Sequence, residues 1–210
     1  MAPLLLLTLL ARDPATPEGA LVSATDGRAT VWVDAGAGLW LGSKRIADLK
    51  TIPTGLALAD DVVVWTSARE GLLTRSQLSI YTRRGELLRE AKVDAPIQVV
   101  LPTEDGAAVG LPGSVWIVPS GKDKPRDVPL PMLSTLDLTL EGGHLQLLAD
   151  GGKLYKLDPK TGCPDPLPVE TEPLLALRAA ETAARCASGE AGAARKTTGR
   201  QPSRVSSQAR

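Results

Sequence analysis

The chain has 210 residues and a formal net charge of zero, and 43% of its residues are hydrophobic while 23% are charged. This balance excludes an intrinsically disordered chain and predicts a packed core. Aromatic residues make up only 3% of the chain, which argues against a surface for stacking single-stranded nucleic acid.

The first predicted element is an apolar run from Leu4 to Ala11. It is too short to span a bilayer and is compatible with the core of a signal peptide, although no Lys or Arg precedes it. We therefore expect residues 1–19 to be a signal peptide and linker, and the protein to be exported to the periplasm or secreted. The alternative is a first strand or buried edge segment in a cytoplasmic protein.

A hairpin-like pattern then recurs along the chain. In Leu78–Glu90, LSIYTRRGELLRE, apolar and polar residues alternate before a turn that contains Gly85. Comparable stretches are anchored on Leu39, Leu78, Val115 and Leu154, in steps of 39, 37 and 39 residues. Self-similarity at a fixed period in this range indicates a repeat architecture.

Each repeat also has a front half made of two strand-like runs. The first runs are Leu21–Ser23, Leu56–Leu58, Ile97–Val100 and Leu136–Thr139. The second runs are Val31–Val33, Val62–Trp65, Ala107–Val109 and Leu145–Leu148. The turns between them contain Asp26, Asp60, Asp61, Asp105 and Glu141. Each unit therefore predicts four short antiparallel strands in about 40 residues, which is one propeller blade.

The hairpins also resemble a known class of repeats. Asp150–Gly162, DGGKLYKLDPKTG, is similar to the outer hairpin of bacterial β-propeller repeats of the WD40-like and quinoprotein-like kinds, as is Leu78–Glu90. The resemblance covers Leu21 to Val169, and it implies blade geometry without implying a chemistry. The expected fold is all-β, a propeller-like array of about four four-stranded antiparallel blades over residues 20–171.

The closure of the propeller and the C-terminal region are linked questions. Three alternatives are open. The four blades close into a ring by themselves, or they form an arc that a second copy or another partner completes, or Leu174–Leu177 starts a fifth unit. Because Glu172–Ala187 is rich in good helix formers, we expect residues 172–210 to form a C-terminal helix and a basic flexible tail. From Arg178 to Arg210 the chain has seven basic and two acidic residues, which suits contact with an acidic surface.

Residues able to carry catalysis or bind metal are few. His144 is the only histidine, which argues against a multi-histidine metal site and a Ser/His/Asp arrangement. We expect no catalytic residue, no cofactor and no metal site. The acidic turns should share one face as a rim, although one acid per blade does not converge on a cation. Cys163 and Cys186 are expected to form a disulfide in an exported chain and to stay free thiols in a cytosolic one.

One insertion departs from the repeat, in Ser67–Gln77 between the second and third strands of the second unit. We expect a loop there, and insertions in repeat proteins often mark a binding face. Its two leucines, Leu72 and Leu73, are adjacent, so at least one should be exposed in an extended segment. Together with Arg69 and Arg75 they predict a protein contact, the alternative being a surface insertion without function.

These features predict a non-catalytic protein-interaction or scaffold module of β-propeller type, with a protein as its partner. The alternative is a propeller enzyme, or a protein that binds a sugar or another small ligand, using the loop face or the central channel. The scarcity of histidine and aromatic residues argues against this alternative.

Overall fold

The computed structural model describes residues 16–188, which form four antiparallel sheets and a C-terminal helix. Sheet 1 consists of β1 (Val22–Thr25), β2 (Thr30–Val33), β3 (Gly38–Leu41) and β4 (Lys44–Asp48). Sheet 2 consists of β5 (Gly55–Leu58), β6 (Asp61–Glu70), β7 (Leu73–Thr82) and β8 (Leu87–Val93). Sheet 3 consists of β9 (Val99–Thr103), β10 (Gly106–Leu111), β11 (Ser114–Pro119) and β12 (Arg126–Pro129). Sheet 4 consists of β13 (Thr135–Glu141), β14 (His144–Ala149) and β15 (Leu154–Leu157), with a 3-10 turn η1 (Asp150–Gly152) before β15.

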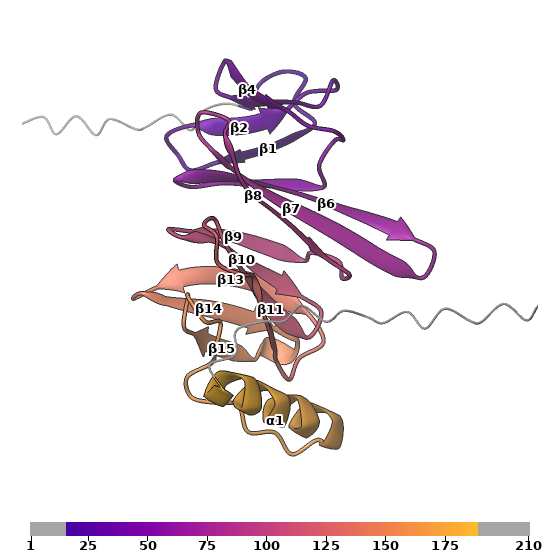
Figure 1. Cartoon of the computed structure of the whole chain (residues 1–210), viewed down its shortest axis with the longest axis vertical. Helices are drawn as coiled ribbons and strands as arrows, with labels where there is room; N and C mark the ends of the chain where they lie inside the picture. The colour runs from indigo at the N-terminus through magenta and orange to yellow at the C-terminus, as the bar shows by residue number, and fades with distance from the viewer. Residues whose placement is uncertain (1–15, 189–210) are drawn as a thin grey trace, which may run out of the picture.

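The sheets follow one another in an open arc. Strands β1 and β2 pack against β5, strands β5 and β6 against β9, and strands β9 and β10 against β13. Figure 1 shows sheet 1 at the upper end of the long axis and the helix α1 at the lower end. Within residues 16–188, sheets 1 and 4 do not pack on each other to a comparable extent. The predicted propeller-like array of antiparallel blades is therefore confirmed, and it is not closed into a ring by these residues.

The core lies between successive sheets in three apolar clusters. One cluster joins sheets 1 and 2, the next joins sheets 2 and 3, and the last joins sheets 3 and 4. All residues of β10 in sheet 3 are buried, whereas burial alternates along β14 and β15 in sheet 4. A strand covered on both faces is apolar throughout, and a strand covered on one face alternates. Sheets 2 and 3 are thus two-sided, and sheet 4 is an end of the array.

Sheet 4 has three strands, whereas each of the other sheets has four. After β15 the chain returns along the sheet edge, where Leu157 and Pro164 form an isolated antiparallel bridge and the Asp165 amide donates to the Lys156 carbonyl over 2.8 Å. Three prolines, Pro164, Pro166 and Pro168, alternate through this segment. Because proline has no amide hydrogen, a full ladder of hydrogen bonds cannot form there.

The predicted C-terminal helix is present as α1 (Pro173–Ser188), and it covers an open sheet edge. Thr182 Oγ1 donates to the Pro129 carbonyl over 2.6 Å, and Arg185 Nη1 donates to the Asp127 carbonyl over 2.9 Å. These carbonyls belong to β12, the last strand of sheet 3, so α1 satisfies backbone groups that would otherwise form a free edge.

The end of α1 is also tied covalently to sheet 4. Cys163, just after β15, and Cys186, in the last turn of α1, form a disulfide with Cα atoms 5.8 Å apart. Across residues 16–188, no helix is long and apolar enough to span a membrane. Most of the expected signal peptide and linker, residues 1–19, and the part of the expected basic tail that follows α1 lie outside the described part of the chain.

Candidate functional site

The insertion in the second repeat is a projecting hairpin and not the loop that the sequence predicts. Strands β6 and β7 are ten residues long, and the segment Ser67–Gln77 continues their ladder in register, from Thr66 opposite Gln77 to Glu70 opposite Leu73. Gly71, with a φ of 66°, allows the tight turn at the tip. Figure 1 shows this hairpin arm, residues 66–77, extending beyond the other sheets.

The outer part of the arm has no third strand. Strand β5 pairs with β6 only as far as Trp65, and β8 pairs with β7 only as far as Ser76. Hydrogen bonds at the base hold the ribbon in place: Ser67 Oγ and Ser76 Oγ are 2.8 Å apart, and Ser76 Oγ donates to the Ala95 carbonyl over 2.7 Å. Because a two-stranded ribbon is marginally stable alone, these contacts with sheet 2 and the chain after it fix the direction of the arm.

The tip of the arm carries apolar side chains in water. Leu72 is 96% exposed and Leu73 is 57% exposed, so the prediction of at least one exposed leucine is confirmed. Arg75 forms a 2.7 Å ion pair with Glu70 on the facing strand, and Arg69 Nε donates to the Gly71 carbonyl over 3.2 Å. The tip is thus an apolar centre with charged neighbours held in place by local contacts.

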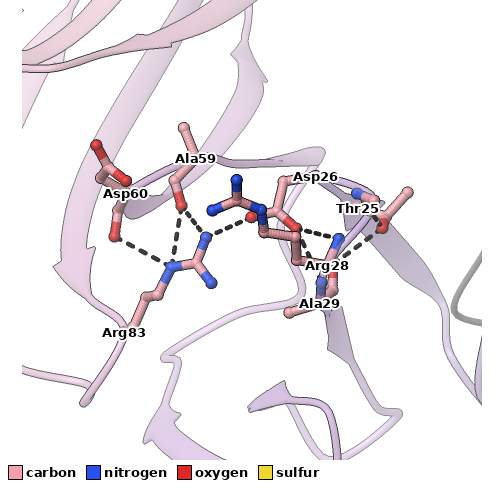
Figure 2. Close-up of polar contacts among 8 residues, drawn as sticks. Thr25, Asp26, Arg28, Ala29, Ala59, Asp60 and Arg83 are labelled. Carbon is pink, nitrogen blue, oxygen red and sulfur yellow. Dashed lines mark hydrogen bonds and ion pairs between the residues drawn. The ribbon is translucent and has the colours of Figure 1, made fainter. Parts of the chain in front are cut away.

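The acidic turns lie at the opposite end of the sheets from this tip, because β6 starts at the turn and ends at the arm. Asp26, in the turn between β1 and β2, binds Arg83 from the turn between β7 and β8. Figure 2 shows the Arg83 side chain reaching Asp26 and the backbone of Ala59 and Asp60 together. Arg83 Nε donates to the Ala59 carbonyl over 3.0 Å. Asp26 therefore joins sheet 1 to sheet 2 and is not an open member of a rim.

The environment of Asp26 stabilises its charged form. The Ala29 amide, which donates to Oδ1 over 2.8 Å, makes the largest contribution and helps to lower the pKa of Asp26 to about 2. Burial opposes this effect, whereas the Arg28 amide, at 2.9 Å, and the Arg83 guanidinium favour it. Asp26 is consequently ionised throughout the range in which the protein is expected to function.

The other turn carboxylates do not converge on a ligand. Burial, followed by the charge of Asp60, raises the pKa of Asp61. Glu141 accepts a 2.7 Å hydrogen bond from Gln146 Nε2, and His144 starts the strand opposite it. In residues 16–188 there is no group of three or more His, Cys, Asp or Glu side chains placed to hold a metal ion.

Sequence reasoning missed the arginines that cross between sheets. Besides Arg83, Arg89 on β8 donates to the carbonyls of Gly121 and Asp123, over 3.2 and 3.0 Å, in the loop that follows β11 of sheet 3. Gly85 lies close enough to sheet 1 that an added Cβ would be 1.8 Å from the Ile46 carbonyl oxygen. The sequence showed only that Gly85 lies in a turn. An arginine by itself does not indicate that its side chain connects two sheets.

Two clefts lie between neighbouring elements. A cleft of about 580 Å³ opens between sheets 3 and 4 at the acidic-turn end, and its lining includes Asp105, Lys124 and Lys160. A second cleft, of about 490 Å³, lies among β8, sheet 3 and α1, and its lining includes Trp116 and Arg178. Both mix charges of either sign, and among the described contacts no lining hydroxyl is hydrogen-bonded to a carboxylate side chain, so their chemistry does not define a reaction.

Comparison with known proteins supports the fold. No protein-family model matches the chain, and no curated protein matches it. Among solved structures it is similar to the computationally designed Ika4 protein, with a TM-score of 0.50, 12% identity, and coverage of 69% of this chain and 93% of that one. It is also similar to the designed Ika8 protein (TM-score 0.41, 13% identity, 67% of this chain and 58% of that one). BamB from Moraxella catarrhalis gives a TM-score of 0.43 and 15% identity over 67% of this chain and 46% of that one.

The designed Ika4 protein is a β-propeller, and its likeness to this chain concerns the propeller fold alone. The chain spans nearly the whole length of the Ika4 protein but only about half the length of the Ika8 protein and BamB.

The bridge between sheets 1 and 2 can be tested by substitution. Arg83→Met removes the bonds to Asp26 and to the Ala59 and Asp60 carbonyls, and leaves a partly buried carboxylate without its cation. We expect the free energy of unfolding to fall by about 2 kcal/mol in urea denaturation. Arg84→Met in the same turn is the matched control, because its side chain is exposed, and it should change stability by less than about 0.5 kcal/mol. Equal effects of the two substitutions would show that Arg83 is not a bridge.

The pKa of Asp26 predicts how stability depends on pH. Because folding lowers this pKa from 3.8 to about 2, ionised Asp26 stabilises the folded state fully above about pH 4. That contribution is lost as the pH falls through 2. Asp26→Asn should therefore flatten the fall in unfolding free energy between about pH 4 and pH 2 relative to the native protein. Parallel curves for the two proteins in this interval would contradict the assignment.

Proposed function

We propose that this protein is a non-catalytic, protein-binding module of β-propeller type, and that it binds its partner through the tip of the hairpin arm. The observation that carries the proposal is the exposure of Leu72, at 96%, beside Leu73, at 57%, at the end of a projecting ribbon. Exposed apolar side chains at such a position lose contact with water only when another molecule covers them.

The chemistry of the tip indicates what kind of partner fits. Two leucines supply an apolar anchor, and Arg69 and Arg75 lie on either side of them along the ribbon. Arg75 already pairs with Glu70 and Asp94, whereas the guanidinium of Arg69 contacts only the Gly71 carbonyl among the described polar contacts and ion pairs. The tip therefore suits a protein that presents a shallow apolar pocket with an acidic side chain at its rim.

The arm is well suited to binding because of how it is held. Its base is bonded to sheet 2 and to the Ala95 carbonyl, so that the direction of the arm is set before the tip is bound. Substitutions at the tip also leave the three apolar clusters untouched, since neither leucine belongs to them. Binding and folding can be separated experimentally for this reason.

The double substitution Leu72→Asp with Leu73→Asp should abolish binding while the fold stays intact. Leu87→Asp with Leu88→Asp is the matched control, because it changes another adjacent leucine pair with exposures of 51% and 41%. We expect the partner captured from the native host to be lost with the first variant and retained with the second, and its Kd for the first variant to rise at least about tenfold.

Circular dichroism and thermal melts of all three proteins accompany this measurement. If the Leu72 and Leu73 variant folds and binds every partner that the native protein binds, the arm tip is not the binding site. If this variant unfolds, the leucines support the structure instead of a contact.

We further propose that the protein works outside the reducing cytosol, either in a periplasm or in the secreted fraction. The disulfide between Cys163 and Cys186 supports this, because such bonds persist in oxidising compartments and are rare in the cytosol. In protein taken from native cells and alkylated at once, both cysteines should resist labelling until a reductant is added. Complete labelling without a reductant would place the protein in a reducing compartment.

A further inference from the structure

At each end of the arc, one face of the terminal sheet has no neighbouring sheet among the described residues. In sheet 1, Val31 and Val33 face sheet 2, so the residues between and beside them point to the outer side. In sheet 4, Leu147 and Tyr155 face sheet 3, and the alternate positions point outward. We call these surfaces the sheet 1 outer face and the sheet 4 outer face.

The sheet 1 outer face carries a rigid aromatic stack. Trp32 and Trp40 are cross-strand neighbours whose rings lie 5.3 Å apart between centroids and 12° from parallel. The Arg45 guanidinium lies over the Trp40 ring, 5.9 Å from its centroid, and also pairs with Asp48. Tryptophan and arginine in this arrangement are the residue types most enriched at the centres of protein interfaces.

Both indole nitrogens of this stack already have acceptors. Trp32 Nε1 donates to the Gly42 carbonyl and Trp40 Nε1 donates to Asp34 Oδ2, each over 2.8 Å. The Asp34 carboxylate also accepts from the Gly38 amide over 2.9 Å. The rings are therefore fixed in orientation, and a molecule that packs on them does so without an entropic cost for ordering the tryptophans.

The sheet 4 outer face is apolar at one end and polar at the other. One cross-strand row joins Asp137, Leu148 and Leu154, and Leu136 lies at the register shift beside it. Leu154 is 62% exposed and Leu136 is 59% exposed. The next row, Thr139, Gln146 and Lys156, is polar. A leucine cluster beside polar residues matches the centre and rim of a protein interface.

We propose that a second copy of this chain docks its sheet 4 outer face on the sheet 1 outer face, so that the leucines around Leu154 cover the Trp32 and Trp40 stack. Applied twice, the same contact closes two arcs into one ring with two equivalent junctions.

A second copy is the occupant that the repeat itself specifies. Within the chain, each sheet packs one of its faces on the next sheet and its opposite face on the preceding sheet. The sheet 4 outer face is the face that would pack on a following sheet, and the sheet 1 outer face is the face that would pack on a preceding sheet. A second chain supplies both missing faces at once, and two chains with four sheets each make eight blades, within the range of about four to eight that is usual for propellers. Arg45 on the sheet 1 outer face and Asp137 beside Leu148 on the sheet 4 outer face also carry opposite charges.

This assembly is independent of binding at the hairpin arm, because the arm belongs to sheet 2 and contributes nothing to either outer face. It is tested on the whole chain by sedimentation velocity over about 1 to 100 µM. We expect the native protein to be a dimer. Trp40→Glu and Leu154→Glu, one substitution on each face, should each give a folded monomer, with a Kd of dimerisation raised at least about tenfold.

Leu72→Asp is the matched control, since it places an acid at an exposed leucine far from both faces, and it should leave the dimer intact. Arg45→Glu replaces Trp40→Glu if that variant fails to fold in circular dichroism, because the Arg45 side chain is about half exposed. It should weaken the dimer in the same direction.

Mixing the two variants tests whether the sheet 1 outer face of one chain contacts the sheet 4 outer face of the other, as opposed to any other dimer contact. Trp40→Glu retains an intact sheet 4 face and Leu154→Glu retains an intact sheet 1 face, so the mixture should form a heterodimer with one working junction. A native protein that stays monomeric at 100 µM overturns the proposal. A dimer that persists with Leu154→Glu, or a mixture that remains monomeric, also overturns it.

Discussion

Apolar side chains buried between one sheet and the next hold this molecule together, since each sheet by itself is a thin layer of three or four short strands. In the middle of the arc, Leu78 and Ile80 of sheet 2 meet Val109 and Val118 of sheet 3, and all four are fully buried. Each such side chain contributes roughly 1.5–3 kcal/mol through removal from water. Polar links such as Arg83 act at the ends of the strands, where they tie one sheet to the next.

This dependence on neighbours also determines where function can lie. Sheets 2 and 3 use both faces for packing, so their strands are unavailable to a ligand except at turns and extensions. Among the surfaces that remain are the hairpin arm, which extends sheet 2 past its neighbours, and the outer faces of sheets 1 and 4. Partner binding would use the hairpin arm, and dimerisation would use the outer faces of sheets 1 and 4. Either contact would bury apolar side chains that the folded chain leaves exposed to water.

One sequence prediction was wrong, at a point where two local signals compete. The polar residues of Ser67–Gln77 indicated a loop. A hairpin that is exposed to water on both faces also carries polar residues, and Gly71 allows the tight turn at its tip. The last unit has three strands, because Pro164 and its neighbouring prolines lack the amide donors that a fourth strand needs.

The sequence by itself determined the repeat, the antiparallel strands and the terminal helix, because alternation, turn residues and helix propensity act over a few neighbouring positions. Strict alternation around Trp32 and Trp40 also carried the information that both rings point away from Val31 and Val33. Only the tertiary structure decided that the four blades form an open arc, and that Asp26 meets Arg83 across 57 positions of chain. Those outcomes depend on the twist and rotation of whole sheets against one another, which no local pattern of residues specifies.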